Sequence, residues 1–272
     1  MFWTRLRSSI VLVIIGVVTL LQGSYLLAAV LLFISMVAYS ELSRACQIHT
    51  DEKVNALEAM GAAGILVYYG IIVFTGSRSA QMLSMLFVMI AFMFVYVFTF
   101  PKYQASQVMA AFFSFVYGPV MFSFIFQTRE LKYGIYLVWM IFISSWVCDS
   151  CAYLTGMLIG KHRMSPKLSP KKSIEGAVGG VIGSALVGGL YGYFIVENVV
   201  SEQQITWIFA VIGAVGAVIS QIGDLAASAI KRNHNIKDYG HLIPGHGGIM
   251  DRFDSVIFTA PMIYSLALWL IE

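Results

Sequence analysis

The sequence predicts an all-α polytopic membrane protein with about nine transmembrane helices and a cytoplasmic N-terminus. Of its 272 residues, 59% are hydrophobic and only 11% are charged. Soluble domains carry about a quarter charged residues, so this chain lacks the polar surface that would face water on all sides. Its apolar residues also gather into runs long enough to cross a bilayer, which takes about 20 residues for each helix.

These candidate spans follow one another along the whole chain. They lie near residues 10–22, 25–40, 59–74, 82–100, 107–126, 133–153, 177–196, 205–223 and 256–271. Only Gln22, Gly23 and Ser24 separate the first two spans. Residues 10–40 therefore form either a tight helical hairpin or one long bent helix, and the second alternative leaves eight spans.

The positive charges predict the orientation. With the N-terminus in the cytoplasm and nine alternating spans, the loops 41–58, 101–106, 154–176 and 224–255 fall inside. Together with the N-terminus they hold 14 of the 17 Lys and Arg residues. An excess of Lys and Arg is typical of cytoplasmic loops, so this arrangement supports an odd number of spans.

Functional groups are unevenly distributed along the chain. Residues 1–132 contain spans joined by short loops and are expected to be a scaffold that faces lipid or packs in a dimer. Residues 133–272 carry carboxylates near helix ends and two polar cytoplasmic loops, 161–176 and 231–254. Glycines concentrate in two of their spans, which predicts closely packed helices there. We expect this second region to be catalytic.

Four aspartates of the second region are candidate metal ligands. They are Asp149, Asp224, Asp251 and Asp254. Asp224 shares one helix face with Ser220 and Ser228, because these residues recur every four positions. Asp251 and Asp254 are three residues apart, which places them on one face of the first turn of the last helix.

Basic residues and glycines beside these aspartates predict phosphate binding. Lys171 and Lys172 are mobile charges in the first polar loop, and Ser173 is a hydrogen-bond donor; contact with anionic lipid is the alternative. Gly247 and Gly248 precede a helix N-terminus, where backbone N–H groups favour an anion.

A divalent cation would reconcile the carboxylates with bound phosphates. Mg²⁺ is commonly held by one or two carboxylates together with substrate phosphates. The alternative is ion pairing with Lys231, Arg232 or Arg252, which accounts for one aspartate but not for all four. We therefore favour a metal site.

Three stretches of the second region resemble the signature of the phosphatidate cytidylyltransferases, also called CDP-diacylglycerol synthases. Residues 228–254 match it without a gap, as SAIKRNHNIKDYGHLIPGHGGIMDRFD. Residues 149–156, DSCAYLTG, and residues 169–176, SPKKSIEG, also fit. One departure is Ile174, which stands where the family often has an aromatic residue. The first half of the chain resembles the family only in being polytopic.

The resemblance implies the reaction of CTP with phosphatidate to give CDP-diacylglycerol and pyrophosphate, with Mg²⁺ required. It also implies an all-helical membrane fold, a homodimer, and a metal centre at the positions of Asp224 and Asp251. Asp254 is then a further ligand or a neighbour of the metal, and Asp149 is a candidate ligand of a second cation.

On this hypothesis the lipid phosphate attacks the α-phosphorus of CTP, and the protein mainly aligns the reactants and neutralises charge. The catalytic candidates are Asp224, Asp251, Lys231, Arg232, His246 and Arg252. The substrate-binding candidates are Ser169, Lys171, Lys172, Ser173, Ser220, Ser228, Lys237, Gly247 and Gly248.

The expected partners are CTP, phosphatidate, membrane lipids and a second copy of the chain, with no nucleic acid. The expected location is the plasma (inner) membrane of a bacterium, with the active site facing the cytoplasm.

Two other functions are alternatives. Intramembrane carboxylates and glycine-rich helices also suit an ion-coupled transporter. The charged groups gather on one side, however, and no comparable set leads to the other side. A CDP-alcohol phosphotransferase would carry closely spaced aspartates around an Ala-Arg pair, and that motif is absent from the sequence.

Overall fold

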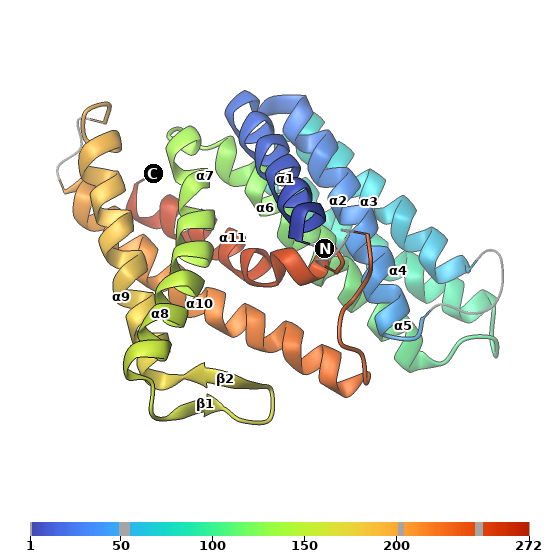
Figure 1. The fold of residues 1–272 in the computed structure, drawn as a ribbon. Helices are drawn as coiled ribbons and strands as arrows, with labels where there is room; N and C mark the ends of the chain where they lie inside the picture. Colours follow the sequence, from blue (N-terminus) through green and yellow to red (C-terminus); the bar gives the residue numbers. More distant parts are fainter. Residues whose placement is uncertain (1, 49–54, 201–203, 243–246, 272) are drawn as a thin grey trace. The chain divides into compact units, whose positions relative to one another are not determined.

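The computed structural model describes residues 2–48, 55–200, 204–242 and 247–271, except the side chains of residues 2–9 and 11. These residues form helices and one small antiparallel sheet (Figure 1). The helices are α1 (Phe2–Gln22), α2 (Ser24–Ala45), α3 (Ala56–Thr75), α4 (Arg78–Phe98), α5 (Ala105–Phe115), α6 (Met121–Arg129), α7 (Gly134–Phe142), α8 (Cys148–Ile159), α9 (Ile174–Tyr191), α10 (Ile205–Asn233) and α11 (Met250–Leu270). The strands are β1 (Arg163–Ser165) and β2 (Ser169–Ser173).

Three π-helical turns join or extend these helices. They are η1 (Val116–Val120), η2 (Ile143–Val147) and η3 (Gly192–Val196). The first two turns make α5–α6 and α7–α8 into continuous helices of membrane-spanning length. Within the described residues, eight helices are long and apolar enough to cross a membrane. The protein is therefore a polytopic helical membrane protein, as the sequence predicts.

Residues 10–40 form two helices. Gly23 separates α1 from α2 with a φ of 64°, in the left-handed region that glycine adopts without steric cost. The described apolar part of α1, Leu12–Gln22, is shorter than the eight long spans.

The chain divides into two compact units. The first comprises Met1–Phe126 and His234–Arg252, and the second comprises Gln127–Asn233 and Phe253–Glu272. The first break in the chain lies close to the expected boundary at residue 132. Residues 234–252, however, group with the N-terminal helices, although they belong to one of the predicted catalytic loops.

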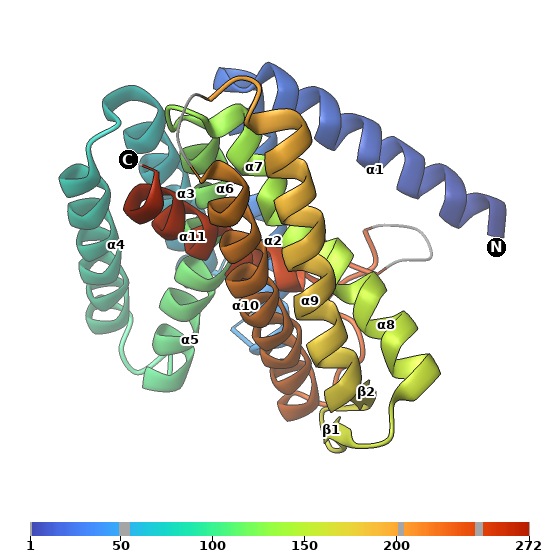
Figure 2. The same ribbon diagram turned by 90° about the vertical axis from the view of Figure 1, so that its left-hand side faces the viewer.

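Aromatic and hydroxyl side chains hold the interior of the first unit together. Ser35 of α2 and Tyr69 of α3 share a buried hydrogen bond of 2.7 Å. The Tyr68 ring packs edge-on against Phe115, with 5.9 Å between the ring centroids. In Figure 2, α3, α4 and α5 of this unit run beside one another.

Small residues bring the helices of the second unit close together. A Cβ atom added at Gly213 of α10 would lie 2.5 Å from the carbonyl oxygen of Ser184 in α9. A Cβ atom added at Gly180 of α9 would lie 2.8 Å from the sulfur of Cys148 in α8. Glycine therefore lets these helices approach closely, in agreement with the packing expected from the sequence.

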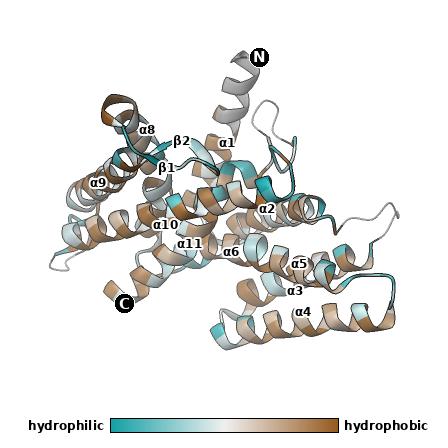
Figure 3. Ribbon diagram, turned by 90° about the horizontal axis from the view of Figure 1, so that it is seen from below, coloured by the Kyte–Doolittle hydropathy of each residue, from teal (hydrophilic) through white to brown (hydrophobic). Residues whose placement is uncertain are grey.

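The expected polar loop 161–176 is mainly a β-hairpin. Strands β1 and β2 pair antiparallel, with Arg163 opposite Ser173, and α9 begins directly after β2. Figures 1 and 2 both place this hairpin at one end of α8 and α9. In Figure 3 the long helices are mostly brown, for hydrophobic residues, and hydrophilic teal is found on the hairpin and other connections.

Candidate active site

An ion pair between Lys172 and Asp224 is the centre of the polar group in the second unit. Lys172 lies near the end of β2, and its ammonium group donates to Oδ2 of Asp224 on α10. Both side chains are 26% exposed, so solvent and a ligand can reach the pair. The structure thus brings together two residues that the sequence placed in separate motifs.

Two more of the predicted aspartates lie within electrostatic range of this pair. Asp149 on α8 interacts with both Lys172 and Asp224. Asp254 on α11 interacts with Asp224, Lys231 and Asp149, and its Oδ1 accepts the N–H of Ser255 at 2.8 Å. Three carboxylates and two lysines from four elements therefore form one charged group, which we call the aspartate–lysine cluster.

The hairpin that carries Lys172 is fixed to α9 by Glu175. One oxygen of this carboxylate accepts the backbone N–H of Lys161 at 3.1 Å, and the other lies 2.6 Å from Nδ1 of His162. The N–H of Ile174 also donates to the carbonyl of His162 at 2.9 Å. The sequence gave Glu175 no individual role, and these contacts show that it closes the hairpin.

Ser173 is part of the same anchor. It is 8% exposed, and its hydroxyl oxygen accepts the N–H of Gly176 at 3.1 Å, which caps the N-terminus of α9. A Cβ atom at Gly156 or Gly160 would lie within 3 Å of this hydroxyl. Its expected contact with phosphate therefore competes with a structural role that the sequence did not indicate.

The hydroxyls predicted beside Asp224 differ from each other in exposure. Ser220 is fully buried, so it lies in the packed interior of the unit and not on a surface open to substrate. Ser228 is half-buried. The helical spacing placed both residues correctly on α10 but could not indicate how deeply neighbouring helices cover one of them.

In the first unit, Asp251 is held by the backbone. The residue is buried, and its Oδ2 accepts the N–H of Tyr239 at 2.8 Å and the N–H of Gly248 at 3.0 Å. Gly247 adopts a φ of 88°, and a Cβ atom there would lie 2.9 Å from Oδ2 of Asp251. These two glycines thus let the chain fold closely around the carboxylate.

Glu41 on α2 binds the same segment. It is 1% exposed, and its two oxygens accept the N–H groups of Ile249 and Met250 at 3.0 and 2.9 Å. The expectation of free backbone donors before the last helix is therefore wrong for Gly248, whose N–H is bonded to Asp251. The sequence offered one signal for Glu41, a lone carboxylate at the end of an apolar span.

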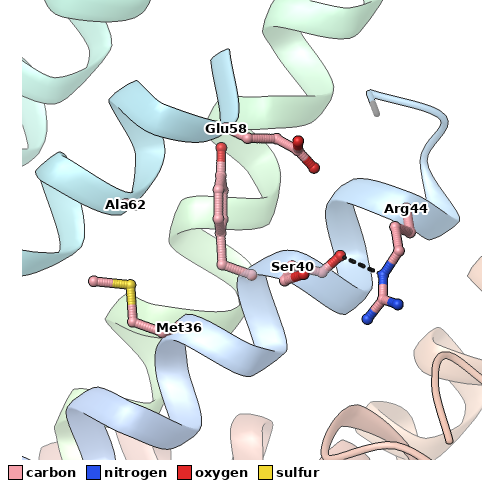
Figure 4. Close-up of a pocket in the computed structure, with 6 residues that line it drawn as sticks. Met36, Ser40, Arg44, Glu58 and Ala62 are labelled. Carbon is pink, nitrogen blue, oxygen red and sulfur yellow. Dashed lines mark hydrogen bonds between the residues drawn. The ribbon is translucent and has the colours of Figure 1, made fainter. Parts of the chain in front are cut away.

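Two cavities in the first unit flank the end of α2. One has a volume of about 500 Å³ and is lined by Met36, Tyr39, Ser40, Arg44, Glu58 and Ala62 (Figure 4). Its Arg44 donates from Nε to the Ser40 carbonyl at 3.3 Å. The second, of about 480 Å³, is lined by Met36, Val37, Ser40, Glu41, Arg44, His241 and Leu242. Arg44 is thus the cationic side chain common to both.

The remaining candidates are mostly on the surface. The exposed basic residues are Lys171, Arg232, Lys237 and Arg252. Lys231 and Ser169 are half-buried. His246 lies outside the described residues.

Carboxylate oxygens are suitable ligands for a hard divalent cation, and the aspartate–lysine cluster supplies several of them. Within the part of the chain that the structure describes, however, no three His, Cys, Asp or Glu side chains are close enough to hold a metal ion by themselves. The residues therefore fit a cation that takes one or two protein ligands and completes its coordination with substrate phosphates.

Comparison with known proteins gives one consistent result. The model of the family described as "Cytidylyltransferase family" matches residues 3–270. The phosphatidate cytidylyltransferase of Staphylococcus saprophyticus is 29% identical over 275 residues, which cover 95% of this chain and 96% of the relative. Phosphatidate cytidylyltransferase of Staphylococcus aureus (strain COL) has the same identity and coverage, and that of Staphylococcus epidermidis is 28% identical over 271 residues, with 95% and 96% covered. The chain therefore belongs to the cytidylyltransferase family and is a nucleotidyltransferase.

Proposed function

We propose that the protein is a phosphatidate cytidylyltransferase, which converts CTP and phosphatidate into CDP-diacylglycerol and pyrophosphate. The observation that carries this proposal is the match to proteins of that name along 95% of the chain. The aspartate–lysine cluster supports it, because it combines cationic groups for phosphates with carboxylates for a metal.

The reaction needs no nucleophilic side chain. An anionic oxygen of the lipid phosphate forms a bond to the α-phosphorus of CTP, and the bond from that phosphorus to the bridging oxygen breaks. Pyrophosphate leaves with the electron pair of the broken bond. Two anions must approach each other, so the main tasks of the protein are alignment and neutralisation of charge.

Lys172 is the first residue to which we assign such a task. Its ammonium group is held at Asp224, partly exposed, at the end of a hairpin anchored by Glu175. A phosphate that enters here meets a lysine that is already positioned and whose charge can be shared between Asp224 and the ligand. Lys171, Lys231, Arg232, Lys237 and Arg252 would contact further phosphate oxygens, with Ser169 and Ser228 as neutral donors and His246 as a donor or proton carrier.

Cytidylyl transfer generally needs a divalent cation, and we propose Mg²⁺. Asp224 and Asp251 would hold it, with Asp254 as a neighbour of the metal, and Asp149 would serve a second cation. When bound, the cation would neutralise charge on the phosphates and stabilise the leaving pyrophosphate. The two backbone N–H groups at Oδ2 of Asp251 fix the orientation of its carboxylate.

We also propose that the protein lies in the plasma membrane as a homodimer, with its polar loops in the cytoplasm. The acyl tails of phosphatidate then remain in the bilayer, while soluble CTP reaches the headgroup from the cytoplasm. The distribution of Lys and Arg supports this orientation.

The test is an assay of the purified protein with CTP, phosphatidate and Mg²⁺, followed by detection of CDP-diacylglycerol. We expect product that depends on all three components, and no product with diacylglycerol in place of phosphatidate. Folded protein without product would overturn the proposal. Ion flux across proteoliposomes under the same conditions would favour a transporter instead.

A further inference from the structure

Glu41 is an unusual residue for a scaffold helix. It is a carboxylate with 1% exposure, on a span that the sequence otherwise indicates is only packing surface. Burying a charge is costly unless hydrogen bonds compensate for it. Here both oxygens are bonded, and both partners are backbone groups that lie 208 and 209 residues away in sequence.

Those partners are the N–H groups of Ile249 and Met250, where α11 begins. The first N–H groups of a helix have no acceptor within the helix, and the helix dipole favours a negative charge there. Glu41 supplies both the acceptors and the charge. It therefore caps the N-terminus of α11.

Two glycines of this segment leave room for the Glu41 carboxylate. A Cβ atom at Gly248 or at Gly240 would overlap the Glu41 side chain, so neither position has room for a larger residue. Gly248 also donates its N–H to Asp251, and Asp251 lies in the turn that Glu41 holds. The two carboxylates thus accept the N–H groups of three consecutive residues, 248–250.

We propose that Glu41 is a positioning residue for cytidylyl transfer, which holds the start of α11, and through it Asp251, in the geometry that the reaction uses. This inference rests on the proposed function. It gives the N-terminal half of the chain a part in the reaction through Asp251, beyond its role as a scaffold.

The test compares Glu41→Gln with Glu58→Gln in the purified full-length protein. Glutamine has one acceptor oxygen, so one of the two N–H groups would face an NH₂ donor and lose its partner. We expect kcat to fall on the order of 10- to 100-fold, the usual effect of removing a group that orients a metal ligand. The Mg²⁺ concentration needed for half-maximal rate should rise, and the KM values for CTP and phosphatidate should change little.

Glu58→Gln is the matched control. This carboxylate lines a cavity of the same unit, and its substitution removes the same charge, so kcat should stay within about twofold of wild type.

A second measurement does not depend on activity. Hydrogen–deuterium exchange in the metal-free protein should show faster exchange at residues 239–242 and 247–250 in Glu41→Gln, with other helices unchanged. Should Glu41→Gln fail to fold, Glu41→Asp, which keeps the charge but shortens the reach, and Gly248→Ala, which pushes against the carboxylate, provide the same comparison.

Three results would count against the inference. Wild-type kcat and Mg²⁺ dependence in a folded Glu41 variant would overturn it, and so would unchanged exchange at 247–250. A lower thermal midpoint with unchanged kcat would mean that Glu41 only stabilises the fold. If the wild-type protein forms no product, the proposed function is rejected instead. The exchange data would still show whether Glu41 stabilises the start of α11.

Discussion

Lys172 has the clearest role among the single residues, because its contact joins two motifs that are 52 positions apart in the sequence. We predict that Lys172→Met lowers kcat/KM for CTP roughly 100-fold, since a positioned charge beside the reacting phosphates is lost. Loss of the ion pair itself should matter little for stability, because both side chains are partly exposed. Steady-state kinetics and a thermal unfolding midpoint measure the two effects separately.

Lys167 provides the control for this prediction. It is an exposed lysine of the same hairpin, in the turn between β1 and β2, and Lys167→Met removes the same charge. We expect near-normal kinetics. Equal loss in both variants would show that the hairpin acts only through its total charge, and the specific role of Lys172 would be rejected.

Residue types at these positions could be predicted from the sequence, but some of their partners could not. The sequence grouped Asp224 with Asp251, joined by Asp254 or Asp149, and the structure brings Asp149 and Asp254 within electrostatic range of Asp224. The capping bond of Ser173 and the bonds of Glu41 depend on which backbone groups the tertiary fold presents. The spacing of neighbouring residues carries no information about contacts between residues more than 200 positions apart in the sequence.

At the scale of the elements, the close packing of α9 against α10 depends on glycine. We predict that Gly213→Ala destabilises the protein by about 1–3 kcal/mol, because the added methyl group would press against the backbone of α9. The thermal midpoint in detergent should fall by several degrees. Activity should fall as well, since α10 carries Asp224.

Gly70→Ala on α3 is the comparison. Among the described residues, nothing lies within 4 Å of a Cβ atom added there, so the midpoint should be unchanged or slightly higher. A Gly213→Ala protein as stable as wild type would show that the two helices can separate without cost.

The helices could be predicted from the sequence, because an apolar run long enough to cross a membrane has few structural alternatives to a helix. The sequence left open whether residues 10–40 form one bent helix or two helices. The positive φ of Gly23, between α1 and α2, shows that they form two. The β-hairpin was missed. Residues 163–173 lack the alternation of apolar and polar residues that predicts a strand, and Glu175, beyond the strands, helps to hold the pairing.

At the scale of the whole molecule, the orientation in the membrane is the first open prediction. We expect Lys167 to be cytoplasmic and Asn198 to be external, as the distribution of Lys and Arg indicates. Single cysteines at these positions, in a variant without Cys46, Cys148 and Cys151, report their side. An impermeant thiol reagent should label Asn198→Cys in intact cells, and Lys167→Cys only after permeabilisation. The reverse pattern would reject the proposed orientation.

The division into two units was only partly visible in the sequence. A change in character near residue 132 was apparent, because polar motifs begin after it. The grouping of 234–252 with the N-terminal helices was not, since it depends on Glu41 and on backbone bonds within that segment. A lone buried carboxylate in an apolar helix is the signal to look for in such chains.

The central claim is that Asp224 and Asp251 both bind the cation used in cytidylyl transfer. Binding of Mn²⁺ in place of Mg²⁺, followed by electron paramagnetic resonance in the presence of CTP, tests it most directly. We predict that Asp224→Asn and Asp251→Asn each weaken Mn²⁺ binding by about tenfold or more while the protein stays folded. Wild-type Mn²⁺ affinity in either folded variant would contradict the claim.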